Sequence, residues 1–176
     1  DNGVTVSSGN AQVANGLSSS SLVDDAFVNS TSIPLNVSYT VNPVSSVGCL
    51  GNSFTVPLVI NPTPVVGDLA ETLCTGSITS VSPADGNGNI LPTGTLYTWT
   101  VSAGAVTGAT SESTASAYGI SDTLVNPTSA AIDVTYTITP QYTYQGITCT
   151  GSSFDYVVTV NPTPVVGDLA ETLCTG

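Results

Sequence analysis

The chain has 176 residues, 40% of them hydrophobic, and twelve Asp and Glu residues give it a net charge of −12 because Lys, Arg and His are absent. A chain without cations has no means of neutralising phosphates, which excludes nucleic acid as a partner, and it lacks the polybasic patch that binds anionic lipid. Catalysis by His or Lys and a His-ligated metal are excluded as well. The apolar content suffices for a folded core, and no apolar run is long enough to predict direct membrane insertion.

An internal repeat organises the sequence. The segment NPTPVVGDLAETLCTG occurs at 61–76 and again, unchanged, at 161–176, an offset of 100 residues. Farther upstream, 24–43 aligns with 121–140 at an offset of 97. A three-residue insertion therefore precedes Cys149, and we expect it in a loop, where insertions are tolerated.

The repeat predicts three parts of the chain. Residues 1–62 are expected to be the C-terminal part of one repeat, 63–162 a complete repeat, and 163–176 the start of the next. A period near 100 is too long for a solenoid, whose repeats run to about 20–50 residues, and it suits a string of β-sandwich domains. We therefore predict an all-β fold of tandem Ig-like sandwiches, in a segment of a longer protein.

Within the complete repeat, the pattern predicts strands almost throughout. GDLAETLC at 67–74 is the only helix-like stretch, and it is expected to be a single turn. Alternating and β-branched residues predict the strands SITSV (77–81), TLYTWTVSA (95–103), AIDVTYTITP (131–140) and FDYVVTVNP (154–162). Trp99 and Tyr136 fall on inward faces and are expected in the core, the alternative for Trp99 being a surface platform for sugar.

The four cysteines are expected to form disulfides in an oxidising, exported setting, because they contain no C-x-x-C pair that would indicate zinc or redox chemistry. Buried free thiols are the alternative. We predict a Cys74–Cys149 bond within the repeat, which would stabilise it by about 4 kcal/mol and leave Cys49 and Cys174 to partners outside the chain. Strand directions in a sandwich argue against that pairing, because they should place the two cysteines at opposite ends of the domain. A bond between neighbouring domains would not meet this objection, because the end of one domain adjoins the start of the next.

One loop has the spacing of a calcium site. ADGNGN at 84–89 places Asp85, Asn87 and Asn89 at alternate positions, as oxygen ligands are placed in calcium loops. The later Glu of such loops is missing, and Asp-Gly and Asn-Gly also form plain turns. Calcium is the only cofactor that the sequence suggests.

The identical segment is expected to be an inter-domain joint. Each copy of NPTP closes a predicted last strand, and its prolines have no N–H to donate to a sheet and stiffen the chain. The joint residues are Pro62, Pro64, Pro162 and Pro164. Identity of the two copies is explained either by a required angle between neighbouring domains or by recent duplication.

Several motifs occur in a characteristic order: ETLCTGSIT, TGTLYTWTVSA, ISDTLVNPT and TCTGSSFDYVVTVNPTP. This set resembles the PKD-like repeats of giant Bacteroidota surface proteins, with most similarity to the SprB-type mobile gliding adhesins. The resemblance implies an Ig-like seven-stranded sandwich, export by the type IX secretion system, and an extracellular place on a filament attached to the outer membrane. It implies as partners the neighbouring repeats, an external surface or polysaccharide, and the gliding and secretion machinery. DTL at 122–124 matches the Bacteroidota O-glycosylation pattern, with Thr123 as acceptor.

The sequence thus predicts a non-catalytic repeat segment of a cell-surface adhesin filament that serves attachment and gliding motility. The alternatives are a carbohydrate- or protein-binding module and spacer repeats of an exported enzyme. The two identical linkers favour a filament, because a specific receptor site is typically a single variant domain. No paired carboxylates are flanked by aromatics as in a glycosidase, so we expect no enzyme.

Overall fold

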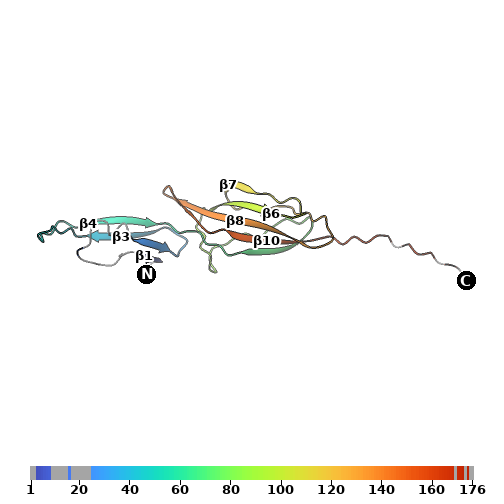
Figure 1. Cartoon of the computed structure of the whole chain (residues 1–176), viewed down its shortest axis with the longest axis horizontal. Helices are drawn as coiled ribbons and strands as arrows, with labels where there is room; N and C mark the ends of the chain where they lie inside the picture. Colours follow the sequence, from blue (N-terminus) through green and yellow to red (C-terminus); the bar gives the residue numbers. More distant parts are fainter. Residues whose placement is uncertain (1–2, 9–15, 17–24, 169, 173, 175–176) are drawn as a thin grey trace.

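All regular structure in the computed structural model is β-strand. The model describes residues 3–8, 16, 25–168, 170–172 and 174. Two blocks of strands lie end to end along the long axis, and the C-terminal segment extends away from the second block (Figure 1). We call the first block, up to residue 62, repeat 1, and the second, residues 63–162, repeat 2. Across the described residues there is no helix, and therefore none that is long and apolar enough to cross a membrane.

Among the described residues, four strands belong to repeat 1 and six to repeat 2. Repeat 1 contains β1 (Val4–Ser8), β2 (Ala26–Asn29), β3 (Leu35–Val41) and β4 (Phe54–Ile60). Repeat 2 contains β5 (Leu69–Cys74), β6 (Leu96–Ser102), β7 (Glu112–Ser116), β8 (Ile132–Tyr144), β9 (Ile147–Thr150) and β10 (Phe154–Asn161).

The main sheet of repeat 2 has the order β5-β10-β8-β6-β7, and β9 pairs with the C-terminal end of β8. β5 runs parallel to β10, in register from Leu69 opposite Tyr156 to Cys74 opposite Asn161. The other pairs are antiparallel. Because the first strand of the repeat lies parallel to the last one, the chain enters and leaves the repeat at opposite ends.

A second layer of short segments covers the sheet and closes the core. Bridges join Ile78 to Thr123 and Thr107 to Val125, so that three extended segments lie side by side. The buried side chains between the two layers come from both: Val106, Ile120 and Leu124 from the short segments, and Tyr97, Trp99, Val134, Tyr136, Ile138, Phe154, Tyr156, Val158 and Val160 from the sheet. The all-β sandwich prediction is confirmed.

The strands predicted from alternation are confirmed at β6, β8 and β10, but two local predictions are wrong. GDLAETLC is not a helical turn, because Leu69–Cys74 is strand β5 and pairs with β10 along its whole length. SITSV at 77–81 does not form a regular strand and makes only the bridge at Ile78. The inserted residues before Cys149 extend β8 and form the tight β8–β9 hairpin, whose last pair is Tyr144 and Ile147.

The pairing of β3 with β4 in repeat 1 has the same register as the pairing of β8 with β10 in repeat 2. Leu35 pairs with Ile60 just as the aligned Ile132 pairs with Val160. One difference is the exposure of the equivalent phenylalanines: Phe54 is 52% exposed, whereas Phe154, packed inside the sandwich, is 3% exposed.

Candidate functional site

The joint between the repeats is the most developed site in the described structure. Pro62 and Pro64 are fully buried there, which fixes the direction of the chain as it leaves β4. Val65 then exchanges two backbone hydrogen bonds with Ile90 of repeat 2, at 2.9 and 2.8 Å. Asn61 lies at the same boundary, and its Nδ2 donates to the carbonyl oxygen of Tyr144 in the β8–β9 hairpin at 3.2 Å. The linker is therefore attached to repeat 2 through Val65, and repeat 1 is attached to the β8–β9 hairpin of repeat 2 through Asn61.

The 84–91 loop of repeat 2 carries one side of this joint. Asp85 Oδ1 accepts from the N–H of Leu91 at 2.8 Å, which closes the loop, and its Oδ2 accepts from Ser32 Oγ of repeat 1 at 2.8 Å. The Leu91 N–H and the Ser32 hydroxyl together lower the pKa of Asp85, because both stabilise the carboxylate. Asn89 Oδ1 accepts from the N–H of Gly67 in the linker at 2.9 Å. The loop thus contacts both repeat 1 and the linker.

These hydrogen bonds bear on the predicted calcium loop. Asp85 and Asn89 already use their oxygens as acceptors from protein donors. Asn87 is exposed and has a φ of 52°, the left-handed conformation of a tight turn. In the portion of the chain that the structure describes, no group of three or more Cys, Asp or Glu residues is arranged to hold a metal. Asp85 and Asn89 therefore have a structural role in the joint, and the calcium site stays a prediction that titration tests.

The opposite side of the joint depends on a glycine. A Cβ atom on Gly151 would lie 2.1 Å from the carbonyl oxygen of Pro64 and 3.0 Å from the side chain of Pro140. The N–H of Gly151 donates to the Pro140 carbonyl at 2.9 Å, as the N–H of Gly51 does to Pro43 in repeat 1, at 2.8 Å. Only glycine therefore allows the linker to approach the end of the hairpin this closely.

The two identical copies of the joint segment differ in burial. In the first copy Val66 is 8% exposed, whereas in the second copy, beyond repeat 2, Val166 is 83% exposed. Likewise Pro64 is buried and Pro164 is exposed. Because the residues are the same, the burial comes from the β-sandwich that follows the segment and not from the segment itself.

The structure places Cys74 and Cys149 at opposite ends of repeat 2. Cys74 lies opposite Asn161 at the C-terminal end of the sheet, and Cys149 lies opposite Tyr142 at the end that faces repeat 1. The ten residues of β8 between these levels span about 30 Å, far beyond the Cα separation of a disulfide. The predicted Cys74–Cys149 bond is therefore one that this fold does not allow. No two of the four cysteines are bonded to each other in the structure; Cys149 is half-buried and the others are exposed, and the prediction that Cys49 and Cys174 have partners outside the chain stays a prediction.

Asp122 of the DTL motif has a structural role. Its Oδ2 accepts from Tyr136 Oη at 2.7 Å and from the N–H of Thr110 at 2.8 Å. Burial, followed by this contact with Asp122, raises the pKa of Tyr136 far above its usual value. The next residue, Thr123, has an exposed side chain, so the glycosylation prediction stays open.

The sandwich offers little to a small ligand. A shallow depression on the solvent side of β6 and β8 is lined mainly by polar side chains, namely those of Thr98, Thr100, Ser111, Glu112, Thr137 and Thr139. Trp99 borders it but is only 8% exposed, and its Nε1 donates to the Thr110 carbonyl at 2.9 Å. The indole ring is therefore part of the core, as predicted, and presents no platform for a sugar.

Sequence reasoning located the joint but missed three of its contacts. Ser32, Tyr144 and Gly151 belong to segments that are distant from the linker in sequence. Alignment of the repeats gives a signal for two of them, because Ser32 aligns with Ser129 and Gly51 aligns with Gly151. Tyr144 lies in the inserted hairpin and has no such counterpart.

The fold and the joint define tandem β-sandwich repeats. The family model described as PKD-like domain matches residues 5–64 and 71–164, one match in each repeat. The chain therefore belongs to the PKD-like domain family, whose members usually occur in extracellular or surface proteins. No curated protein and no solved structure gave a significant match to the chain.

Proposed function

We infer that this chain is a non-catalytic segment of a long cell-surface filament, in which PKD-like repeats act as spacers. The observation that carries this proposal is the joint. Asn61 and Ser32 of repeat 1 contact repeat 2 directly, and Pro64 of the linker packs against Gly151 of repeat 2, so the following repeat buries the end of the preceding one. A series of such joints would produce an extended rod.

The finer part of the proposal is that the filament is a Bacteroidota adhesin for surface attachment and gliding. Its partners would be neighbouring repeats, an external surface or polysaccharide, and the gliding and type IX secretion machinery, and it needs no cofactor. The motif resemblance supports this part. The low charge density and the absence of Lys and Arg suit an exposed filament as well, because trypsin-type proteases have no site to cleave.

Binding of the chain to an array of glycans distinguishes a spacer from a binding module. A spacer should show no saturable binding at micromolar concentrations. Saturable binding that is lost when Thr98 and Thr137, in the depression on β6 and β8, are replaced by bulky residues would establish a carbohydrate-binding module instead. The matched control replaces Thr135 of the same strand, which lies outside that depression.

A further inference from the structure

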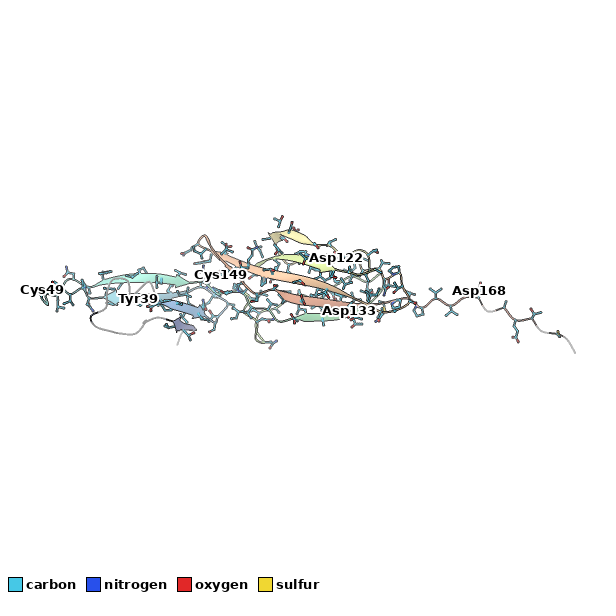
Figure 2. The ribbon with its side chains drawn as sticks, viewed as in Figure 1. Tyr39, Cys49, Asp122, Asp133, Cys149 and Asp168 are labelled. Atoms are coloured by element: carbon cyan, nitrogen blue, oxygen red, sulfur yellow. The ribbon has the colours of Figure 1, made fainter. Side chains whose placement is uncertain are left out.

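Repeat 2 contains a cysteine near each end, Cys74 and Cys149, and repeat 1 contains Cys49 at the position that aligns with Cys149; none of them is bonded to another cysteine of the described chain. Figure 2 shows Cys149 at the end of repeat 2 that faces repeat 1, and Cys49 at the far tip of repeat 1. Cys74 ends β5 at the other end of repeat 2, where the chain leaves toward residue 163. We call Cys74 the first-strand cysteine of repeat 2, and Cys149 and Cys49 the hairpin cysteines of repeats 2 and 1. Within one repeat the two kinds of cysteine lie at opposite ends. When one repeat follows another, the end with the first-strand cysteine of the first meets the end with the hairpin cysteine of the second.

The joint between the two repeats places these positions relative to each other. In repeat 2, Cys74 lies directly opposite Asn161 on the neighbouring strand. Asn61 is the same residue of the same motif in repeat 1, so a first strand paired in that register would place its cysteine beside Asn61, about 5 Å away. Asn61 itself donates to Tyr144 in the β8–β9 hairpin, the hairpin that contains Cys149.

We propose that the first-strand cysteine of each repeat forms a disulfide with the hairpin cysteine of the repeat that follows it. Cys74 would bond to the hairpin cysteine of a repeat beginning at residue 163, and in a tandem array Cys149 would bond to the first-strand cysteine of the repeat before its own. The proposal rests on the tandem array of the proposed function. The bond spans the joint, so it holds neighbouring repeats together independently of the linker.

The bond forms by thiol–disulfide exchange with an oxidised dithiol carrier or with oxidised glutathione. The Cys74 thiolate attacks one sulfur of the oxidant, forms a mixed disulfide and releases one thiolate. The hairpin thiolate then attacks the Cys74 sulfur, closes the protein disulfide and releases the second thiolate. Two protein thiols lose two electrons and two protons in total, and the oxidant disulfide becomes two thiols.

The absence of Lys and Arg allows a clean test. A second copy of residues 77–162 is added after Gly176, so that a complete repeat follows repeat 2 and can pair with Cys74. Val165 is replaced by Lys, which creates the only trypsin site, between repeat 2 and the added repeat. After oxidation with oxidised glutathione, free thiols are blocked and the protein is cleaved in urea. The two fragments should stay joined without reductant and separate completely when reductant is added.

Two substitutions assign the bond. Cys74→Ser should release the fragments without reductant, whereas the matched control Cys149→Ser should leave them joined. Separation of the fragments in the parent chain would overturn the proposal, since a bond within one repeat, or no bond, gives that result. Fragments that stay joined in Cys74→Ser would overturn it too. The outcome is independent of the glycan experiment, so failure of one proposal is distinguishable from failure of the other.

Discussion

At the scale of single residues, a buried asparagine fixes the same turn in both repeats. Asn126 Nδ2 donates to the carbonyls of Ala130 and Val160 at 2.8 Å, and its Oδ1 accepts from the N–H of Thr128 at 2.9 Å. Asn29 makes the equivalent bonds in repeat 1. The side chain thereby ties the turn before β8 to the end of β10. The asparagine that aligns in the two repeats, Asn29 and Asn126, therefore has a structural role.

Asn126→Ala should destabilise repeat 2 by about 1–3 kcal/mol, because the buried Val160 carbonyl and the Thr128 N–H both lose Asn126 as their partner. Urea unfolding followed by Trp99 fluorescence measures the change. The control Thr123→Ala removes an exposed side chain and should change the unfolding free energy by less than about 0.5 kcal/mol. Equal effects of the two substitutions would contradict the role assigned to Asn126.

Glu71 makes repeat 2 sensitive to acid. Burial opposes its charge, but hydrogen bonds from Ser80, at 2.6 Å to the hydroxyl, and from Tyr156 favour the carboxylate more, and the net effect lowers the pKa of Glu71. A carboxylate with a lowered folded pKa stabilises the protein above its unfolded pKa of about 4.3, and this contribution is lost as the pH falls through the folded value.

Glu71→Gln should therefore reduce the loss of unfolding free energy between pH 7 and pH 3. Urea unfolding at the two pH values gives the comparison. Glu171→Gln is the matched control, since it changes the same residue of the motif in the exposed C-terminal segment. If Glu71→Gln and Glu171→Gln kept the same acid dependence as the parent chain, the carboxylate contribution would be refuted.

At the scale of elements, the end of the β8–β9 hairpin limits how the linker can run. Gly151→Ala should place a methyl group against the Pro64 carbonyl and cost about 1–3 kcal/mol through overpacking. Amide hydrogen exchange should accelerate at Val65 in the linker, whose N–H donates to the Ile90 carbonyl of the 84–91 loop. In the control Gly119→Ala the nearest atom to the new Cβ is 3.6 Å away, so exchange at Val65 should not change.

The 84–91 loop gives a second prediction at this scale. Because Asp85 is the only carboxylate in residues 84–91 and the later Glu of calcium loops is missing, millimolar calcium should leave the melting temperature unchanged. Differential scanning calorimetry with and without the ion tests this. A rise of several degrees that disappears in Asp85→Asn would instead establish the loop as a calcium site.

Strict alternation of apolar and polar residues made the long strands predictable, because one face of β6 and β8 is buried and the other is exposed to solvent. β5 was not predictable in the same way, because Leu69 and Leu73 have the i, i+4 spacing of a helix and the strand depends on pairing with β10. The joint was located from its prolines. Its contact between Ser32 and Asp85 joins polar residues that are 53 positions apart, and no local pattern predicts such a contact.

At the scale of the whole molecule, the joint contacts determine how the repeats are held relative to each other. Ser32→Ala removes the hydroxyl that reaches Asp85 and should broaden the distribution of inter-repeat angles seen by small-angle X-ray scattering. Ser129→Ala is the matched control, because Ser129 aligns with Ser32 but lies at the end of repeat 2 that faces no described repeat. The joint assignment fails if both variants scatter like the parent chain.

The parallel pairing of β5 with β10 determines how a repeat responds to tension. A pull along a filament draws the start of β5 toward one end and the end of β10 toward the other. The two strands can separate only by sliding past each other, so the force loads the hydrogen bonds from Leu69 to Cys74 in shear, all at once. Unzipping an antiparallel hairpin from one end breaks its bonds one at a time. A repeat built in this way resists stretching along its own axis most strongly, the direction in which an anchored filament is pulled.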